Sequence, residues 1–233
     1  MQLESEEVDA EYYNLIPSRF PTIDVFARIS SGRSNEVAEV ECLTNPRLKA
    51  KERLLNGVSV VDVEDPLIQN WNHAPFTYPN PDGTRYFPST RSALELSEDL
   101  QTALAISVRK REAFLSYTCE NPISLEMRMF KRRVRGRFAN GRGWNPNMAS
   151  KERRLRGQQV IDQGLDGVLF RPAERSCGVC ITVLSGATLG RTVQADHFKF
   201  IWDGSQISTV YSFSSGEALT PEQLCSEMSV IAH

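Results

Sequence analysis

Two cysteines stand at the spacing used by redox pairs and zinc sites, in the run Cys177-Gly-Val-Cys180. Redox pairs of this kind open a helix, whose dipole lowers the thiol pKa, whereas this pair runs into an apolar stretch typical of a strand. A four-cysteine zinc site needs a second pair, and the chain has none. We therefore expect buried or half-buried thiols here and no metal site.

A second group of chemically notable residues is a basic segment, residues 128–156. It holds eleven Lys or Arg and one acid, Glu152, so the rest of the chain carries a net charge of about −12. Such a segment could bind nucleic acid or an acidic protein, or could be a solvated surface. No known nucleic-acid-binding motif is present, which favours a protein partner over nucleic acid. The expected partner contacts are Lys131, Arg132, Arg133, Arg135 and Arg137.

Helices and strands that would position these residues alternate unevenly along the chain. A helix is predicted from Ser97, as the N-cap, past Lys110 and Arg111, with Phe114 on its apolar face. A second helix is expected at 151–163, ended by Gly164. Thr220-Pro-Glu-Gln223 is a capping box that predicts a short third helix. A further short helix is possible at 35–43.

The strands are predicted from apolar alternation and from short buried runs. The predicted strands are 23–29, 124–134, 167–170, 179–184 and 197–202. Residues 66–90 are rich in proline and 136–149 in glycine and asparagine, so both are expected as loops. Nothing resembles a linker, which indicates one α+β (mixed α/β) domain.

Composition narrows the class of protein. The 233 residues are 40% hydrophobic and 24% charged, with a net charge of −2, as in an ordinary soluble domain. No apolar run approaches the roughly 18 residues of a membrane span. The acidic N-terminus is unlike a secretory signal. Five scattered cysteines favour a reducing compartment, so we expect a cytoplasmic protein with no membrane association.

Several blocks, taken in order, resemble the RES domain family, in the branch that begins with a Pro-Ser-Arg-Phe-Pro motif. They are residues 15–28, 43–47, 84–86, 99–105, 111–115, 166–170 and 201–204. The match runs from about residue 13 to about residue 206. It divides the chain into a polar lead-in at 1–12, which we expect to be frayed, a RES-like domain at 13–206 and a C-terminal extension at 207–233 that packs on the domain.

The resemblance implies a split, twisted sheet flanked by helices, related to the ADP-ribosyltransferase fold. It also implies an NAD⁺-degrading toxin that cleaves the nicotinamide–ribose bond or transfers ADP-ribose. The partner would be a helix-turn-helix (Xre-type) antitoxin, and an oligomer is compatible with this. NAD⁺ would be a substrate or ligand rather than a tightly bound cofactor. Such chemistry needs a carboxylate to stabilise the cationic ribose and arginines to hold the pyrophosphate.

The resemblance also assigns positions in this chain. Arg28 and Arg85 match the family's pocket arginines, and Tyr86 completes an Arg-aromatic pair, so all three are expected to bind nucleotide. Glu95 stands where the family has a pocket tyrosine, and Ile106 stands where it has an acidic residue. The family's Ser-x-Arg is here residues 172–174.

Several positions that carry the chemistry in the family therefore differ in this chain, whereas the blocks that carry the resemblance are retained. An isoleucine cannot stabilise a developing cation, and a proline offers no side-chain hydrogen bond. Two hypotheses follow. In the first, the chain is an NAD⁺ glycohydrolase or ADP-ribosyltransferase in which Glu95 replaces the missing carboxylate. In the second, it is an inactive relative that acts as a decoy, a regulator or an assembly subunit.

Overall fold

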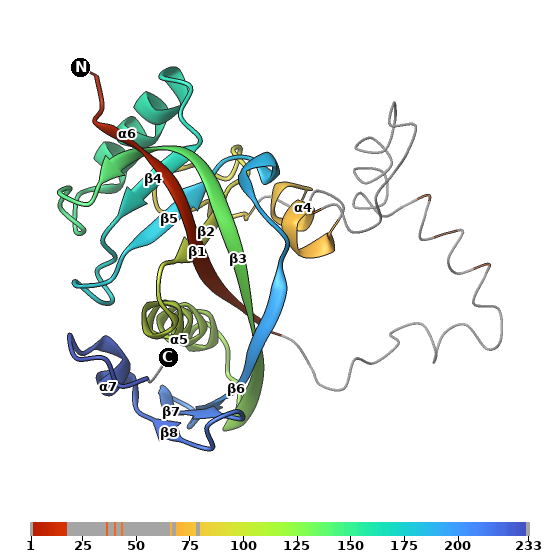
Figure 1. The fold of residues 1–233 in the computed structure, drawn as a ribbon. Helices are drawn as coiled ribbons and strands as arrows, with labels where there is room; N and C mark the ends of the chain where they lie inside the picture. Colours follow the sequence, from red (N-terminus) through yellow and green to blue (C-terminus); the bar gives the residue numbers. More distant parts are fainter. Residues whose placement is uncertain are drawn as a thin grey trace.

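The long strand β3 (Ile123–Gly141) holds most of the sheet together in this computed structural model (Figure 1). The structure describes residues 2–17, 69–77 and 80–231, together with residues 36, 40, 43 and 66. One edge of β3 pairs with β1 (Ser5–Pro17) in a long antiparallel ladder. Its other edge pairs first with β6 (Val193–Trp202) and then, in parallel, with β4 (Gly167–Phe170).

Five of the described strands close into a ring. The order is β1, β2 (Leu94–Ser97), β5 (Cys180–Val183), β4 and β3, and β3 pairs back to β1. Side chains from all five strands fill the ring, among them Val8, Leu96, Phe138, Leu169 and Ile181. Burying these apolar side chains together is the main force that closes the ring.

The sheet continues from β3 beyond the ring. There β6 pairs with β7 (Ile207–Ser212), which pairs with β8 (Ala218–Leu219). Figure 1 shows the ring strands and the β6–β8 end joined by the bent ribbons of β1 and β3. The expected single α+β domain is therefore confirmed, and its eight described strands form one large mixed sheet.

Helices cover the sheet on separate faces. Between the ring and the β6–β8 end lies α5 (Leu100–Ser116), whose Leu104 and Val108 pack against Met129 and Phe200 (Figure 1). The short α7 (Pro221–Cys225) joins the same core. Over β4 lies α6 (Ser150–Asp162). The remaining short elements are α4 (Asn70–Thr77) and the 3₁₀ turn η1 (Gly186–Thr188).

Several local predictions are confirmed. Strand β4 has the predicted bounds, and α6 ends before Gly164, which has a φ of +64°. The predicted capping box is formed around Thr220. Residues 36, 40 and 43 are helical, as the expected helix at 35–43 requires. The predicted strand 23–29 lies outside the described residues.

Other predictions were wrong, mostly for strands whose pairing partners are distant in the sequence. Residues 5–12 are not a frayed lead-in, because they form the first part of β1 and pair with β3. The expected loop 136–149 begins late, since β3 runs to Gly141. The N-cap of α5 is Asp99 and not Ser97, because Ser97 belongs to β2. Phe114 is 60% exposed and lies outside the core.

Gly167 is the tightest backbone position in the ring. It has a φ of +153°, and a Cβ there would lie 1.8 Å from the carbonyl oxygen of Thr182 on β5. We expect Gly167→Ala to lower the free energy of unfolding by about 3 kcal/mol or more, since backbone strain adds to overpacking. Urea denaturation followed by circular dichroism measures this.

The matched control is Gly143→Ala. A Cβ at Gly143 meets nothing within 4 Å. This variant should unfold within about 0.5 kcal/mol of the wild type. Equal stability of the Gly167 variant and the wild type would contradict the tight approach of β4 to β5.

Candidate functional site

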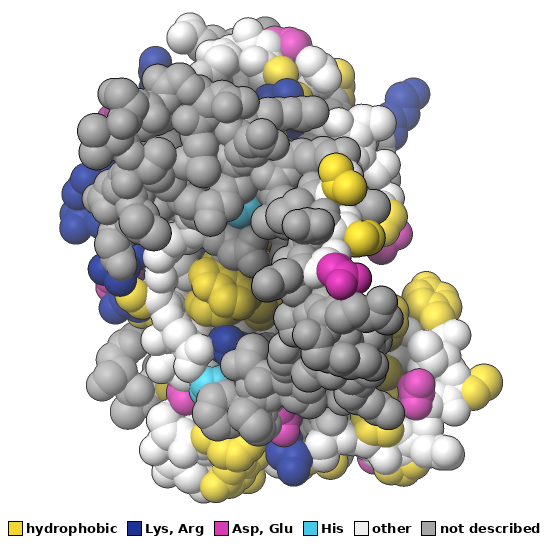
Figure 2. Space-filling model, turned by 90° about the vertical axis from the view of Figure 1, so that its right-hand side faces the viewer, with side chains coloured by type: hydrophobic (Ala, Val, Ile, Leu, Met, Phe, Trp, Pro, Cys, Tyr) yellow, Lys and Arg dark blue, Asp and Glu magenta, His cyan; other side chains and the backbone are white. Residues whose placement is uncertain are grey.

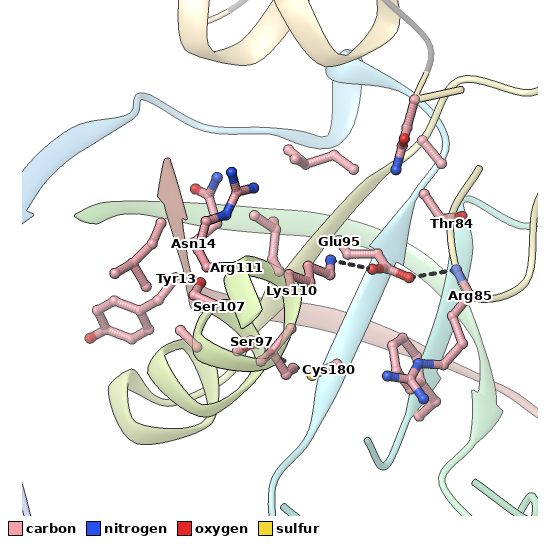
Figure 3. A pocket seen from close by; sticks show the side chains of 18 of the residues that line it. Tyr13, Asn14, Thr84, Arg85, Glu95, Ser97, Ser107, Lys110, Arg111 and Cys180 are labelled. Carbon is pink, nitrogen blue, oxygen red and sulfur yellow. Dashed lines mark hydrogen bonds and ion pairs between the residues drawn. The ribbon is translucent and has the colours of Figure 1, made fainter. Parts of the chain in front are cut away.

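A cavity of about 260 Å³ lies between α5, β1, β2 and the segment before β2 (Figure 3). Its described wall includes Asn14 from β1, Arg85 and Glu95 around β2, and Ile106 and Arg111 from α5. The structure thus brings together three of the positions that the sequence singled out: Arg85, Glu95 and Ile106. Arg28 lies outside the described residues.

Arg85 is held by a carboxylate from the segment after β4. Its Nη2 donates to both oxygens of Glu174, at 2.9 and 2.8 Å, and its guanidinium stacks 5.3 Å from the centre of the Phe170 ring. Burial lowers the pKa of Arg85, but the Glu174 and Glu95 carboxylates outweigh burial and raise it. Arg85 is therefore charged, and its charge is matched within the protein.

Both oxygens of Glu95 are engaged as well. Oε1 accepts from the backbone N–H of Arg85 at 2.7 Å, and Oε2 accepts from Lys110 Nζ at 2.9 Å (Figure 3). Burial raises the pKa of this carboxyl, but the Lys110 ammonium and the Arg85 N–H together bring it below its ordinary value. Glu95 is thus an ionised carboxylate that faces the cavity and is paired there.

Tyr86 does not line the cavity, so its assignment as a nucleotide-binding residue is corrected. Only 1% of it is exposed, and its ring makes edge-on contacts with Trp144 and Phe170. Its carbonyl oxygen lies so close to α6 that a Cβ at Gly157 would be 2.3 Å away. Tyr86 therefore anchors the segment that carries Arg85, and it cannot stack on a base.

The wall offered by α5 combines an apolar side chain with polar ones. Ile106 lies among the lining residues, as does the adjacent Ser107, and Lys110 and Arg111 follow about one turn further along. Arg111 belongs to a block quoted for the family resemblance, but no functional role was predicted for it. Its repeat spacing from Ile106 and Ser107 on one helix face was the available signal.

Part of the basic segment is matched by acidic residues of β1. Asp9 accepts from both Arg133 and Arg135, Glu11 pairs with Lys131 at 2.8 Å, and Glu6 pairs with Arg142. In the view of Figure 2, Lys and Arg side chains in dark blue follow the left edge of the molecule, with a few Asp and Glu side chains in magenta near them. Four of the eleven basic side chains that suggested an external partner are therefore paired with carboxylates of β1.

Arg132 was predicted to contact a partner, and this prediction was wrong because the side chain is buried. Only 2% of it is exposed, so it cannot contact a partner. It donates to the backbone oxygen of Trp71 and to the side-chain oxygens of Asn72 and Asn14, at 3.1, 3.0 and 2.7 Å. The side chain ties α4 and β1 to β3.

The two cysteines of the CxxC run differ in environment. Cys177 is exposed, and Cys180 is buried beside Ser97, whose Oγ is 3.5 Å from its Sγ. Burial raises the pKa of the Cys180 thiol to about 12. Within the described ranges, no three His, Cys, Asp or Glu side chains are arranged to hold a metal ion. No described helix is long and apolar enough to cross a membrane.

The comparisons with known proteins place this cavity-bearing α+β domain in a family. The family model described as "RES domain" matches residues 62–203. An uncharacterized protein, y4oC, of Sinorhizobium fredii (strain NBRC 101917 / NGR234) is 46% identical over 217 residues, which cover 92% of this chain and 93% of that protein. The chain belongs to the RES domain family.

A solved structure was also matched. A chain from the crystal structure of the M. tuberculosis MbcT–MbcA toxin–antitoxin complex is 12% identical to this one. The alignment covers 82% of this chain and 86% of that chain, with a TM-score of 0.43.

The thiol environments predict selective labelling. In the native protein at pH 8, iodoacetamide should modify Cys177 and spare Cys180, because a pKa of about 12 leaves only about one Cys180 thiol in 10⁴ ionised. Peptide mass spectrometry measures the extent at each site. The exposed Cys119 is the internal control, and labelling of Cys180 at a similar rate would contradict its burial.

Proposed function

We propose that this chain binds NAD⁺ or a related nucleotide in its cavity without cleaving it by the route that the family resemblance implies. Its action would then depend on the complexes it forms, as a regulator, a decoy or an assembly subunit. The observation that carries this proposal is the pairing of Arg85 with Glu174. Glu174 stands where the family resemblance places an arginine.

The Arg85–Glu174 ion pair makes Arg85 less able to bind an anionic ligand in the cavity. Nη2 of Arg85 donates to both oxygens of Glu174, so the guanidinium charge is already paired with a carboxylate charge, although through one nitrogen rather than through the two-nitrogen fork. A pyrophosphate that approached Arg85 would have to displace Glu174, or would bring further negative charge next to it. A ligand that keeps its phosphates away from Arg85 would avoid this repulsion.

The part of the cavity wall formed by α5 lacks the carboxylate that the family resemblance places there. Ile106 lines the cavity at the position of the family's acidic residue. Loss of nicotinamide leaves positive charge on the ribose, and a hydrocarbon side chain cannot stabilise it. Glu95 is the carboxylate among the described lining residues, and the charge of Lys110 offsets it.

The test is to incubate the purified protein with NAD⁺ and to follow free nicotinamide by chromatography, with and without phosphate. We expect no release above a heat-inactivated control, and saturable NAD⁺ binding by calorimetry. Ile106→Glu, which restores a carboxylate to the α5 wall, is the companion variant and should raise nicotinamide release above the wild-type level. Rapid release by the wild type would overturn the proposal.

One observation favours the other hypothesis, that of an enzyme built on Glu95. Since its pKa is lowered, Glu95 is ionised at neutral pH and faces the cavity. If Glu95 is catalytic, Glu95→Gln should reduce nicotinamide release by at least about 100-fold. Glu217→Gln, at an exposed residue, is the control and should leave the rate unchanged.

The pH dependence gives a second readout for this enzyme hypothesis. A catalytic group with a lowered pKa stays ionised as the pH falls, so activity should persist below the ordinary glutamate pKa of about 4.3. The rate is measured between pH 3.5 and 8 over the range in which the protein stays folded. A rate that halves near pH 6 would exclude Glu95 as the group that controls it.

A protein partner of the antitoxin type would meet a smaller basic face than the sequence suggested. Asp9 is shared by two arginines, and Arg137 donates to the hydroxyl of Ser5 rather than to a carboxylate. Arg135 therefore shares one carboxylate with Arg133, and Arg137 has no carboxylate among the described ion pairs, so both exposed side chains keep positive charge. We propose these two residues as the partner contacts that remain from the basic segment.

A further inference from the structure

The charges of the cavity do not cancel. Its charged lining residues in the described part of the chain are Arg85, Glu95, Lys110 and Arg111. Arg85 is matched by Glu174, and Lys110 is matched by Glu95. Arg111 is left with a positive charge that no described carboxylate meets. Its described contact is the ring of Phe114, 5.9 Å from the guanidinium carbon.

Arg111 is also partly withdrawn from water. It is half-buried, and burial lowers the pKa of its guanidinium. A partly desolvated cation without a counter-ion raises the free energy of the empty site. An anion in the cavity would offset this cost, so the site favours a negatively charged ligand.

Asn14 adds a donor to the same wall. Arg132 Nη2 donates to Asn14 Oδ1 at 2.7 Å. Because a guanidinium has donors only, the amide of Asn14 must turn its oxygen to Arg132 and its NH₂ group away from it. Asn14 and Arg111 line the same cavity, and the view of Figure 3 draws them toward one side of it and Arg85 toward the other.

We propose that Arg111 and Asn14 form a subsite for the phosphate or diphosphate group of the ligand, and that the buried Arg132 is the positioning residue that orients Asn14. The inference deepens the proposed function, since it concerns the same cavity. It replaces Arg85 by Arg111 as the anion-binding arginine. Ser107, which also lines the cavity, is placed to add a hydroxyl donor.

The size of the cavity agrees with a diphosphate as the group that is enclosed. About 260 Å³ lies just below the range of roughly 300–1,000 Å³ usual for sites that enclose a whole small molecule. A diphosphate with part of its nucleoside fits this volume. The rest of a dinucleotide would extend beyond the described wall.

Calorimetry on the full chain with three probes tests the subsite: NAD⁺, ADP-ribose and inorganic pyrophosphate. Arg111→Gln keeps a polar side chain of similar length and removes the charge. We expect the Kd for ADP-ribose and pyrophosphate to rise by at least about tenfold. The matched control, Arg109→Gln, removes an exposed arginine of the same helix that pairs with Glu112, and should change the Kd less than twofold.

A second variant separates positioning from folding. Asn14→Asp keeps an acceptor for Arg132 and supplies a counter-ion to that buried arginine, so the Tm should be equal or higher. It also turns the amide donor into an anion that faces the cavity. Binding of pyrophosphate should therefore be lost while the protein stays folded. Unchanged binding by both Asn14→Asp and Arg111→Gln would overturn the subsite.

The three probes distinguish this inference from the proposed function. If the wild type binds pyrophosphate through Arg111 but binds neither NAD⁺ nor ADP-ribose, the subsite stands and the proposed function is wrong. If the wild type binds NAD⁺ and Arg111→Gln binds it equally well, the proposed function stands and the subsite is wrong. Failure of the wild type to bind any probe would overturn both.

Discussion

The ladder between β1 and β3 is the interaction on which the rest of the structure depends. It closes the five-strand ring, and it leaves the opposite edge of β3 free to carry both β4 and β6. The charge pattern supports the register, because the acidic side chains of β1 lie opposite the basic side chains of β3. Exposed ion pairs of this kind add little stability one by one, but a shift of one residue would move Val8 and Tyr12 out of the core.

The same ladder carries the cavity. Asn14 belongs to β1 and Arg132 to β3, so the amide of Asn14 is oriented only when the two strands are in register. The neighbouring β2 supplies Glu95, and α5 supplies Lys110 to pair with it. The cavity therefore depends on how the ring and α5 meet, and internal pairing already satisfies two of the three cationic side chains in its described wall.

The sequence predicted elements whose signals are local. The apolar run of β4, the glycine that ends α6 and the capping box of α7 each lie within a few residues. β1 was missed because its stabilisation comes from β3, far along the chain, and its acidic composition resembles that of a disordered end. Ser97 was taken for an N-cap because its place in β2 depends on pairing with β5.

In the candidate site, too, the sequence predicted the residues but not their partners from distant parts of the chain. Arg85, Glu95 and Ile106 were found through the family resemblance, and the structure places all three at one cavity. Their partners could not be predicted, because Arg85 and Glu174 are 89 residues apart in the sequence and meet only in the fold. Tyr86 was misassigned because a sequence does not show which of two neighbouring side chains faces the core. Arg111 was overlooked because its importance comes from the pairing of the other charges.

The connectivity of the ring has a consequence for how the chain reaches this structure. Arg142 and Glu6 meet across 136 positions of sequence, so closing the ring costs the entropy of a very long loop before any of its contacts form. Such a topology has a high contact order and is expected to fold slowly. On the ribosome, β1 leaves the exit tunnel long before β3 exists, with a free strand edge. Its row of carboxylates then acts as a gatekeeper against self-association, so the charges that later fix the register first keep the nascent strand soluble.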